Sequence, residues 1–326
     1  MIHKALNNLF LKIWYNNNFL FRIIALSLIP FSILYYIAFN LKKTLTQKNS
    51  FSANIICVGN IVVGGSGKTT IALSLIEMLP NKKIVVLLRG YKGNLKELTK
   101  VKPEHTVIDV GDEALLYSQV VSTYTCSNRK NAINKIIENE NPDLIILDDG
   151  LQDMSINKNK NIIAINGRRG FGNKLVLPAG PMRQTISTVP KNNSIFLIVG
   201  DDKTSIIPKY ENHMNTLYQA RLISNIQGDG NKIYAFSGVA DNENFFDTLE
   251  KQDFKIINKT SFPDHYNFTD IEIKKIINNA IKDKVDVYTT SKDWVRLKKE
   301  YQDIIKQLPI KIEIDNQQSF IKSILS

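Results

Sequence analysis

Residues 54–70 read NIICVGNIVVGGSGKTT, and this stretch indicates the fold of the chain. An apolar run of strand character leads into a glycine-rich turn and then into a helical pattern that stops at Pro80. Glycines let backbone amides close around an anion, and the N-terminus of the following helix adds its dipole. Lys68 would reach the terminal phosphates of a nucleotide, and the Thr69 hydroxyl would bind Mg²⁺. The stretch therefore predicts a phosphate-binding loop.

This loop departs from the usual pattern at one position. The pattern has a glycine five residues before Gly67, where this chain has Val62. The strand before the turn and the helix after it favour a phosphate-binding loop over a plain glycine turn with a solvated lysine. The residues expected to bind the nucleotide are Gly64, Gly65, Ser66, Gly67, Lys68, Thr69 and Thr70.

Strand-like apolar runs alternate with helical stretches along most of the remaining chain. These runs are almost continuously apolar, which is typical of parallel strands covered by helices on both faces. Near residues 217–231 the chain becomes polar, and a second series of strands and helices follows. We predict an α/β fold with a membrane-associated helical segment (1–48), a P-loop core with a mostly parallel sheet (49–220) and a smaller C-terminal α/β domain (221–326).

Composition places the 326-residue chain among globular proteins. With 43% hydrophobic and 22% charged residues, it is not expected to be disordered, collagen-like or a polytopic membrane protein. Its two cysteines lie far apart and its four histidines lack ligand spacing, which argues against a disulfide scaffold or a cysteine metal site. The net charge is 42 − 31 = +11, and no Asp or Glu precedes Glu77. This basic N-terminal part favours an anionic membrane surface, and not a nucleic acid, as a partner.

An uncharged apolar segment, Ile23–Phe39, lies inside the basic region. As a helix its 17 residues would be about 25 Å long, slightly less than the hydrocarbon thickness of a bilayer, and Pro30 would kink it. A cleaved signal peptide fits poorly, because the leader is long and no small-residue cleavage site follows. A buried core helix remains an alternative. We expect a membrane-inserted or interfacial anchor, whose orientation the equal basic flanks do not fix.

Two adjacent carboxylates, Asp148 and Asp149, end an apolar run in the stretch DLIILDDGLQD (143–153). The carboxyl end of a parallel strand faces the ligand crevice, so an acid beside a phosphate loop is the expected second Mg²⁺ ligand. Because neighbouring residues of a strand point to opposite sides, the two acids should differ in role. Asp148 fits the metal side and Asp149 fits a catalytic base, with a solvated strand-end pair as the alternative.

Two further residues are candidates for catalysis. Asp112 follows a strand and opens a helix, where it would act as a helix cap or as part of the metal or phosphate site. His265 lies just before a helix that starts with a capping box of Thr269 and Glu272, so its loop has a defined geometry. A lone histidine is more often structural than catalytic, but the loop of this one can reach across to the other domain.

Several basic residues lie on loops that follow strands. Arginine forks bind phosphates and carboxylates, so Arg89, Arg168 and Arg183 are candidates for substrate binding. Asn173 belongs to the same NGRRGFGN loop as Arg168 and is a further candidate. Plain surface loops are the alternative for each. Lys292, in a turn after a strand of the second series, either faces the same crevice or starts a helix.

Taken together, these motifs resemble the tetraacyldisaccharide 4'-kinase family of lipid A biosynthesis. Thr70 and Gly170 depart from prolines that are common in the family, whereas Val62 does not, because its members also lack the first glycine. The resemblance covers nearly the whole chain. It rests on VGNIVVGGSGKT (58–69), RGYKG (89–93), GDEALL (111–116), DDGLQD (148–153), NGRRGFGN (166–173), LPAGPMR (177–183), DHYNF (264–268) and TTSKDWVRL (289–297).

The resemblance implies ATP- and Mg²⁺-dependent transfer of the γ-phosphate to the 4'-hydroxyl of a tetraacylated glucosamine disaccharide 1-phosphate, which yields lipid IVA. By the same resemblance, Asp149 is the base and is oriented by His265, and Asp112 is an active-site acid. The implied location is the cytoplasmic face of the inner membrane of a Gram-negative bacterium. The ATP and Mg²⁺ ligands implied in this way are Lys68, Thr69 and Asp148.

Two other functions remain open from the residues alone. One is a soluble P-loop kinase of a small metabolite, with the N-terminal helix buried in the core. The other is a nucleotide-driven assembly or regulatory ATPase or GTPase. The sequence has no guanine-specificity motif of the N/TKxD type at a strand end, and its acidic pair suits a hydroxyl acceptor, so a kinase is favoured.

Overall fold

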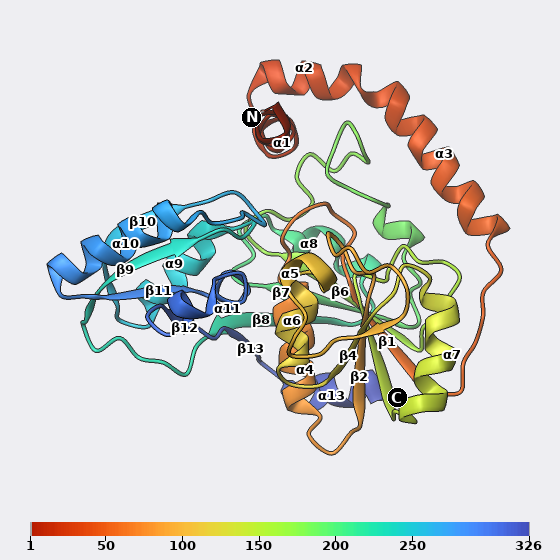
Figure 1. Cartoon of the computed structure of the whole chain (residues 1–326). Coiled ribbons are helices and arrows are strands. Elements are labelled where there is room, and N and C mark those ends of the chain that lie inside the picture. The colour runs from red at the N-terminus through yellow and green to blue at the C-terminus, as the bar shows by residue number, and fades with distance from the viewer. Residues whose placement is uncertain (1, 326) are drawn as a thin grey trace.

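The computed structural model describes residues 2–325. These residues form two sheets with flanking helices (Figure 1). Within these residues the larger sheet has nine strands, in the order β13-β8-β7-β6-β1-β5-β2-β4-β3. Its neighbouring strands are parallel, except that β13 is antiparallel to β8 and β3 to β4. The strands are β1 (Asn54–Gly59), β2 (Ile84–Leu88), β3 (Thr99–Lys100), β4 (Ser122–Thr125), β5 (Leu144–Asp148), β6 (Lys160–Asn166), β7 (Ser194–Val199), β8 (Leu217–Ile223) and β13 (Lys311–Ile314).

The central strands of the larger sheet are buried on both faces, which explains their continuous apolar sequences. Ile55 of β1 packs in the same core cluster as α7 (Arg129–Glu140), whereas the next residue, Ile56, packs in the cluster of α4 (Lys68–Met78). Burying one isoleucine side chain contributes about 1.5–3 kcal/mol. The predicted mostly parallel sheet with helices on both faces is confirmed.

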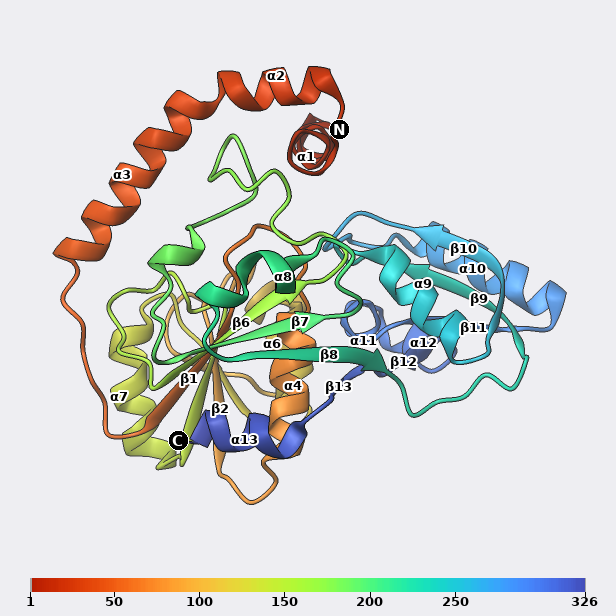
Figure 2. The same cartoon turned by 180° about the vertical axis from the view of Figure 1, so that it is seen from behind.

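The second sheet is parallel, has the order β10-β9-β11-β12 and lies beside the larger one (Figure 2). We refer to it and its helices as the smaller unit. Its strands are β9 (Lys232–Ser237), β10 (Lys255–Ser261), β11 (Asp286–Thr290) and β12 (Lys306–Leu308). Its helices are α9 (Asn242–Lys251), α10 (Asp270–Asp283), α11 (Ser291–Trp294) and α12 (Lys299–Gln302).

The chain returns to the larger sheet at its end, which differs from the predicted C-terminal domain of residues 221–326. Strand β13 pairs with β8, and the last helix, α13 (Gln317–Leu325), shares a core cluster with α4 (Figure 2). The Ile312 N–H donates a hydrogen bond to the Ser74 hydroxyl at 2.9 Å, and Phe320 is fully buried. The apolar side chains of the last strand and helix thus find their partners on the first sheet. The smaller unit is therefore an insertion between β8 and β13.

Among the described residues, the larger unit has three further short helices. They are α5 (Val107–Val110), α6 (Asp112–Ser118) and α8 (Ile206–Tyr210), with 3-10 turns at Ile186–Thr188 and Glu211–His213.

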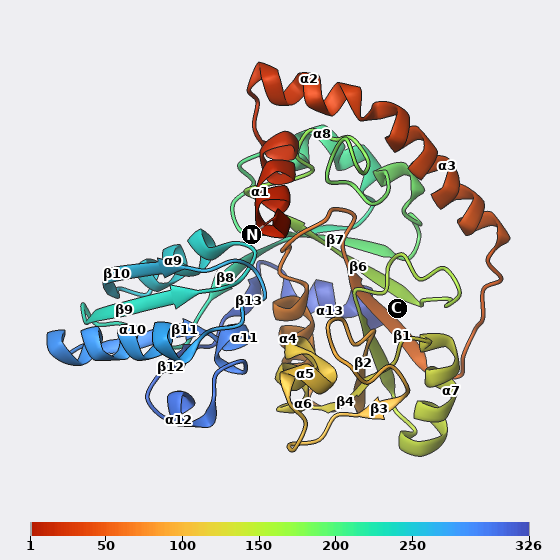
Figure 3. The same ribbon diagram turned by 45° about the horizontal axis from the view of Figure 1, so that its top comes forward.

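Three N-terminal helices, α1 (Ile2–Tyr15), α2 (Phe19–Ser27) and α3 (Ile29–Leu45), form an arch beside the larger unit (Figure 3). Trp14 of α1 packs with Val63 and Leu177, and its indole N–H donates to the Pro178 carbonyl at 3.0 Å. Pro30 lies in the first turn of α3, where its missing N–H breaks no helical hydrogen bond. The arch is thus attached to loops of the larger unit through α1.

Helices α2 and α3 expose large apolar side chains, including Phe19 (76% exposed) and Leu34 (65%). This exposure does not fit the alternative of a buried core helix. Across residues 2–325, no single helix is long and apolar enough to cross a membrane. Helices α2 and α3 meet that criterion only as a pair, bent by 50°. The membrane anchor stays a prediction.

Candidate active site

The predicted phosphate loop has the expected strand, turn and helix. Strand β1 ends at Gly59, and α4 begins at Lys68. Gly64 and Gly67 have φ angles of 112° and 78°, a left-handed conformation that favours glycine. The Asn60 side-chain amide donates to the Gly64 carbonyl at 3.2 Å and to the Ser66 hydroxyl at 2.9 Å, which fixes the turn. Free amides at the start of α4 make this a ready anion site.

Asp148, at the end of β5, is buried beside this loop. Its Oδ2 accepts a hydrogen bond from the Tyr117 hydroxyl at 2.9 Å, while its buried Oδ1 has no hydrogen-bond partner among the described residues. Burial, followed by the charge of Glu113, raises the pKa of Asp148 to about 7. Thr69 Oγ1 donates to Glu113 Oε1 at 3.4 Å. An unpaired carboxylate oxygen and a hydroxyl are hard oxygen ligands, so these residues fit Mg²⁺.

Asp149, the residue that follows β5, lies beside two cationic side chains. Its φ of 50° is left-handed, and its N–H donates to the Val58 carbonyl at 2.9 Å. Its carboxylate accepts from Arg183 Nη1 at 2.9 and 3.1 Å, and Lys68 Nζ lies 3.8 Å away. Burial opposes ionisation, but the charges of Lys68 and Arg183 outweigh it and lower the pKa of Asp149. Arg129 donates to the main-chain carbonyls of both acids and so holds the turn.

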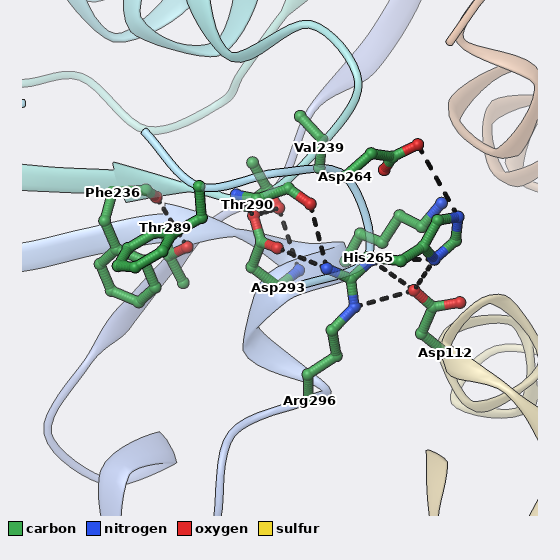
Figure 4. A network of polar contacts seen from close by, with 12 residues as sticks. Asp112, Phe236, Val239, Asp264, His265, Thr289, Thr290, Asp293 and Arg296 are labelled. Atoms are coloured by element: carbon green, nitrogen blue, oxygen red, sulfur yellow. Dashed lines mark hydrogen bonds and ion pairs between the residues drawn. The ribbon is translucent and has the colours of Figure 1, made fainter. Parts of the chain in front are cut away.

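The expected contact between His265 and Asp149 is not made in this structure. His265 Nδ1 instead lies 2.9 Å from Asp112 Oδ2, which also accepts from Arg296 Nε at 2.8 Å (Figure 4). Burial disfavours the Asp112 anion, but the His265 hydrogen bond and the charges of Lys292 and Arg296 hold its pKa well below the usual range. The ionised carboxylate is therefore the acceptor, and Nδ1 carries the proton.

Chain topology explains this correction. The loop that carries His265 comes from the smaller unit and meets the N-terminus of α6, where Asp112 is the first helical residue after the cap Gly111. Asp149 is already occupied by Arg183 and Lys68. The structure thus brings together Asp112 and His265, and separately Asp149 and the phosphate loop.

The other predicted basic residues have different surroundings. Arg183 reaches Asp149, whereas Arg168 forms an ion pair with Asp247 of α9. The Asn173 amide donates to the Ala179 carbonyl at 2.8 Å, so this side chain shapes its own loop. Arg89 follows β2 and is exposed.

Several site residues were missed or left open by the sequence reasoning. Lys292 Nζ donates to Glu113 Oε1 at 2.9 Å, a contact between the smaller and the larger unit. Tyr117 and Arg129 are buried partners of the strand-end acids, and Arg296 reaches Asp112. Arg296 lies in the motif TTSKDWVRL (289–297), which gave it no role, whereas Tyr117 and Arg129 lie outside the motifs of the sequence analysis.

One cavity of about 1930 Å³ joins these groups. Both units line it, and so do helices α1 and α3, through Trp14 and Tyr35. The cavity therefore has room for a nucleotide and for part of a large second substrate. Its lining includes the whole phosphate loop, Arg89, Asp112, Asp148, Asp149, Arg183, His265 and Lys292.

Comparison with known proteins points to one family. The family described as Tetraacyldisaccharide-1-P 4'-kinase matches residues 24–326. Among similar proteins, the tetraacyldisaccharide 4'-kinase of Rickettsia bellii is 33% identical over 311 residues, which cover 94% of this chain and 95% of the relative. The Rickettsia typhi protein of the same name is 30% identical over 311 residues, with the same coverage of both chains.

A solved structure has the same fold. It is the crystal structure of LpxK from Aquifex aeolicus, described as an "apo" form in complex with ATP. The match has a TM-score of 0.74 and 24% sequence identity, and it covers 93% of this chain and 98% of the other.

Proposed function

Because the chain belongs to the tetraacyldisaccharide 4'-kinase family, we propose how its active site carries out the reaction of that family. The chain is a kinase of lipid A biosynthesis that phosphorylates the 4' position of a tetraacyldisaccharide. ATP supplies the γ-phosphate, the acceptor is the 4'-hydroxyl of the disaccharide 1-phosphate, and the product is lipid IVA. The reaction needs in-line positioning, neutralisation of phosphate charge and an acceptor for the hydroxyl proton.

The triphosphate binds at the turn between β1 and α4. The amides that start α4 and the Lys68 ammonium offer positive charge to its terminal phosphates. Thr69 and Asp148 would hold Mg²⁺, which neutralises phosphate charge when it is bound. The Tyr117 hydroxyl fixes the orientation of Asp148 through its hydrogen bond to Oδ2. The unpaired Oδ1 of Asp148 supports this assignment.

The Asp112–His265 pair receives the proton of the acceptor hydroxyl. Because Nδ1 of His265 donates to ionised Asp112, the imidazole has its other nitrogen, Nε2, available as a base. The carboxylate fixes the tautomer and stabilises the imidazolium that forms, as in other Asp–His pairs. The contact of 2.9 Å between His265 Nδ1 and Asp112 Oδ2 is the observation that carries this proposal.

Asp149 and Arg183 act on the phosphate side of the site. Asp149 is held by two cations, Lys68 and Arg183, so it is a weak base and a counter-charge for the residues that meet the nucleotide. Arg183 and Arg89 line the cavity near the loop, and their guanidinium groups suit a phosphate of either substrate. This replaces the expectation that Asp149 takes the proton.

The apolar arch of α2 and α3 associates with the cytoplasmic face of the bacterial inner membrane. A tetraacylated acceptor stays in the bilayer, so a kinase that acts on it must work at the membrane surface. The exposed apolar side chains of α2 and α3 would enter the interface, and Lys42 and Lys43 at the end of α3 would attract anionic lipid. Trp14 of α1 and Tyr35 of α3 line the cavity, which supports a cavity that opens on the lipid side.

The experiment compares three variants of the full chain in detergent micelles, with γ-labelled ATP and tetraacyldisaccharide 1-phosphate. We expect Asp112→Asn and His265→Ala to lower kcat by roughly 10²- to 10⁴-fold, while ATP affinity changes by less than about threefold. Asp149→Asn should instead raise the concentration of MgATP that is required. Wild-type turnover in the His265 variant, or a pure kcat loss only in the Asp149 variant, would contradict the assignment.

A further inference from the structure

Arg296 lies at the centre of the contacts between the two units. It follows α11 in the smaller unit, and its side chain is only 4% exposed. Its Nε donates to Asp112 Oδ2 at 2.8 Å, and its Nη2 donates to the same oxygen (Figure 4). Nη2 also lies 3.4 Å from His265 Nδ1. One guanidinium therefore contacts both members of the proposed proton-accepting pair.

Asp112 is held on both of its oxygens. Oδ2 receives His265 Nδ1 and two nitrogens of Arg296, and Oδ1 accepts from the Glu113 N–H at 2.9 Å. A carboxylate with four donors has one orientation and stays ionised. Because Asp112 belongs to the larger unit whereas His265 and Arg296 belong to the smaller one, this orientation exists only while the units are in contact.

The Arg296 guanidinium is also held by hydrogen bonds within the smaller unit. Nη1 donates to Asp293 Oδ1 at 2.8 Å and to the Gly238 carbonyl at 3.1 Å. Asp293 is fully buried, and its Oδ2 accepts from the Gly238 N–H at 2.8 Å and from the Thr290 hydroxyl at 2.7 Å. The backbone N–H of His265 donates to the same Gly238 carbonyl at 3.1 Å. The Arg296 side chain and the His265 backbone are thus hydrogen-bonded to one carbonyl.

We propose that Arg296 is a positioning residue of the transfer reaction, which holds Asp112 and His265 in a single geometry across the junction of the two units. The inference rests on the proposed role of that pair. Because the Arg296 guanidinium contacts both residues of the pair, the pair assembles at the same time as the two units come into contact. Arg296 would contact neither ATP nor the lipid.

A lysine at this position would keep the charge and lose the function. The planar fork of arginine reaches Asp112 and Asp293 at the same time, whereas a single ammonium on a flexible stem cannot bridge both with fixed angles. An electrostatic role alone would be preserved by Arg296→Lys. A positioning role would not, and a small displacement of the pair costs roughly 10- to 100-fold in rate.

The test measures kcat and KM for both substrates in wild type, His265→Ala and Arg296→Lys, with ATP affinity measured separately. We expect Arg296→Lys to lose roughly 10- to 100-fold in kcat, with ATP affinity and lipid KM within about threefold of wild type. Asp247→Asn is the matched control, because it removes an ion pair across the same junction away from the pair. It should keep kcat within about threefold.

The outcomes separate this inference from the proposed function. Wild-type kcat in Arg296→Lys overturns the positioning role while His265→Ala still reports on the pair. An equal kcat loss in Asp247→Asn also overturns it, because any weakening of the junction would then suffice. A loss of ATP affinity in step with kcat, or a thermal transition lowered far enough to unfold Arg296→Lys at the assay temperature, would mark a purely structural residue and has the same consequence.

Discussion

Replacing Asp148 by asparagine should stabilise the ligand-free protein at pH 8 and abolish phosphoryl transfer. The side chain is 3% exposed, and burial with the charge of Glu113 raises its pKa to about 7 from an ordinary value of 3.8. At 1.36 kcal/mol per pH unit, this difference costs the folded state about 4 kcal/mol above pH 7. Asparagine keeps the shape, removes the charge and can still accept from Tyr117.

The direction of the stability change follows from the linkage between protonation and folding. A carboxyl whose pKa is higher in the folded than in the unfolded state favours folding fully below about pH 4, and this contribution is lost as pH rises through about 7. Asp149 is the matched neighbour with the opposite sign. Lys68 and Arg183 outweigh burial and lower its pKa, so its contribution is present above about pH 4 and is lost at lower pH. Asp149→Asn should therefore destabilise the protein at pH 8.

Thermal unfolding with EDTA at pH 5 and pH 8 checks both signs. Each kcal/mol corresponds to roughly 1.5 °C in Tm for a chain of this size. We expect Asp148→Asn to melt several degrees above wild type at pH 8, with a smaller gain at pH 5 and no gain from added Mg²⁺. A lower Tm than wild type at pH 8 would refute the reasoning, because it would mean that the buried anion is already compensated within the protein.

Two further predictions concern the metal site and the membrane. Tyr117→Phe removes the donor to Asp148, a hydrogen bond to a charged group worth about 1.5–3 kcal/mol, and should raise the Mg²⁺ concentration needed for half-maximal turnover by tenfold or more; an unchanged Mg²⁺ titration would contradict it. Phe31→Glu with Leu34→Glu should reduce co-sedimentation with anionic phospholipid vesicles, whereas Ile271→Glu, at an exposed isoleucine of α10, should not. Equal losses in both proteins would show that α3 is not the contact.

The larger sheet and its phosphate loop were predictable because their signals are local. Continuous apolar runs such as Ile84–Leu88 are typical of parallel strands covered on both faces, and the GKT turn joins one such strand, β1, to a helix. The strand-end acids follow from the same rule, since the carboxyl ends of parallel strands meet the ligand.

Contacts between distant segments were not predictable from the sequence. His265 was assigned to Asp149, but the partner of a lone histidine depends on how the smaller unit meets α6. Strand β13 pairs with β8 of the larger sheet. The sequence pattern around Ile312 would be the same for a strand of either sheet, so it does not indicate which sheet the strand joins. Arg296 resembles any charged residue of a short helical turn until the fold buries it.

A double-mutant cycle of Asp112→Asn and His265→Ala tests the central claim most directly. If the two residues accept the proton as one unit, either single change removes nearly the whole effect, and the double variant should turn over no more slowly than the slower single variant. Losses in kcat that multiply in the double variant would mean that the two side chains act independently, and the proton would then have to leave by another route.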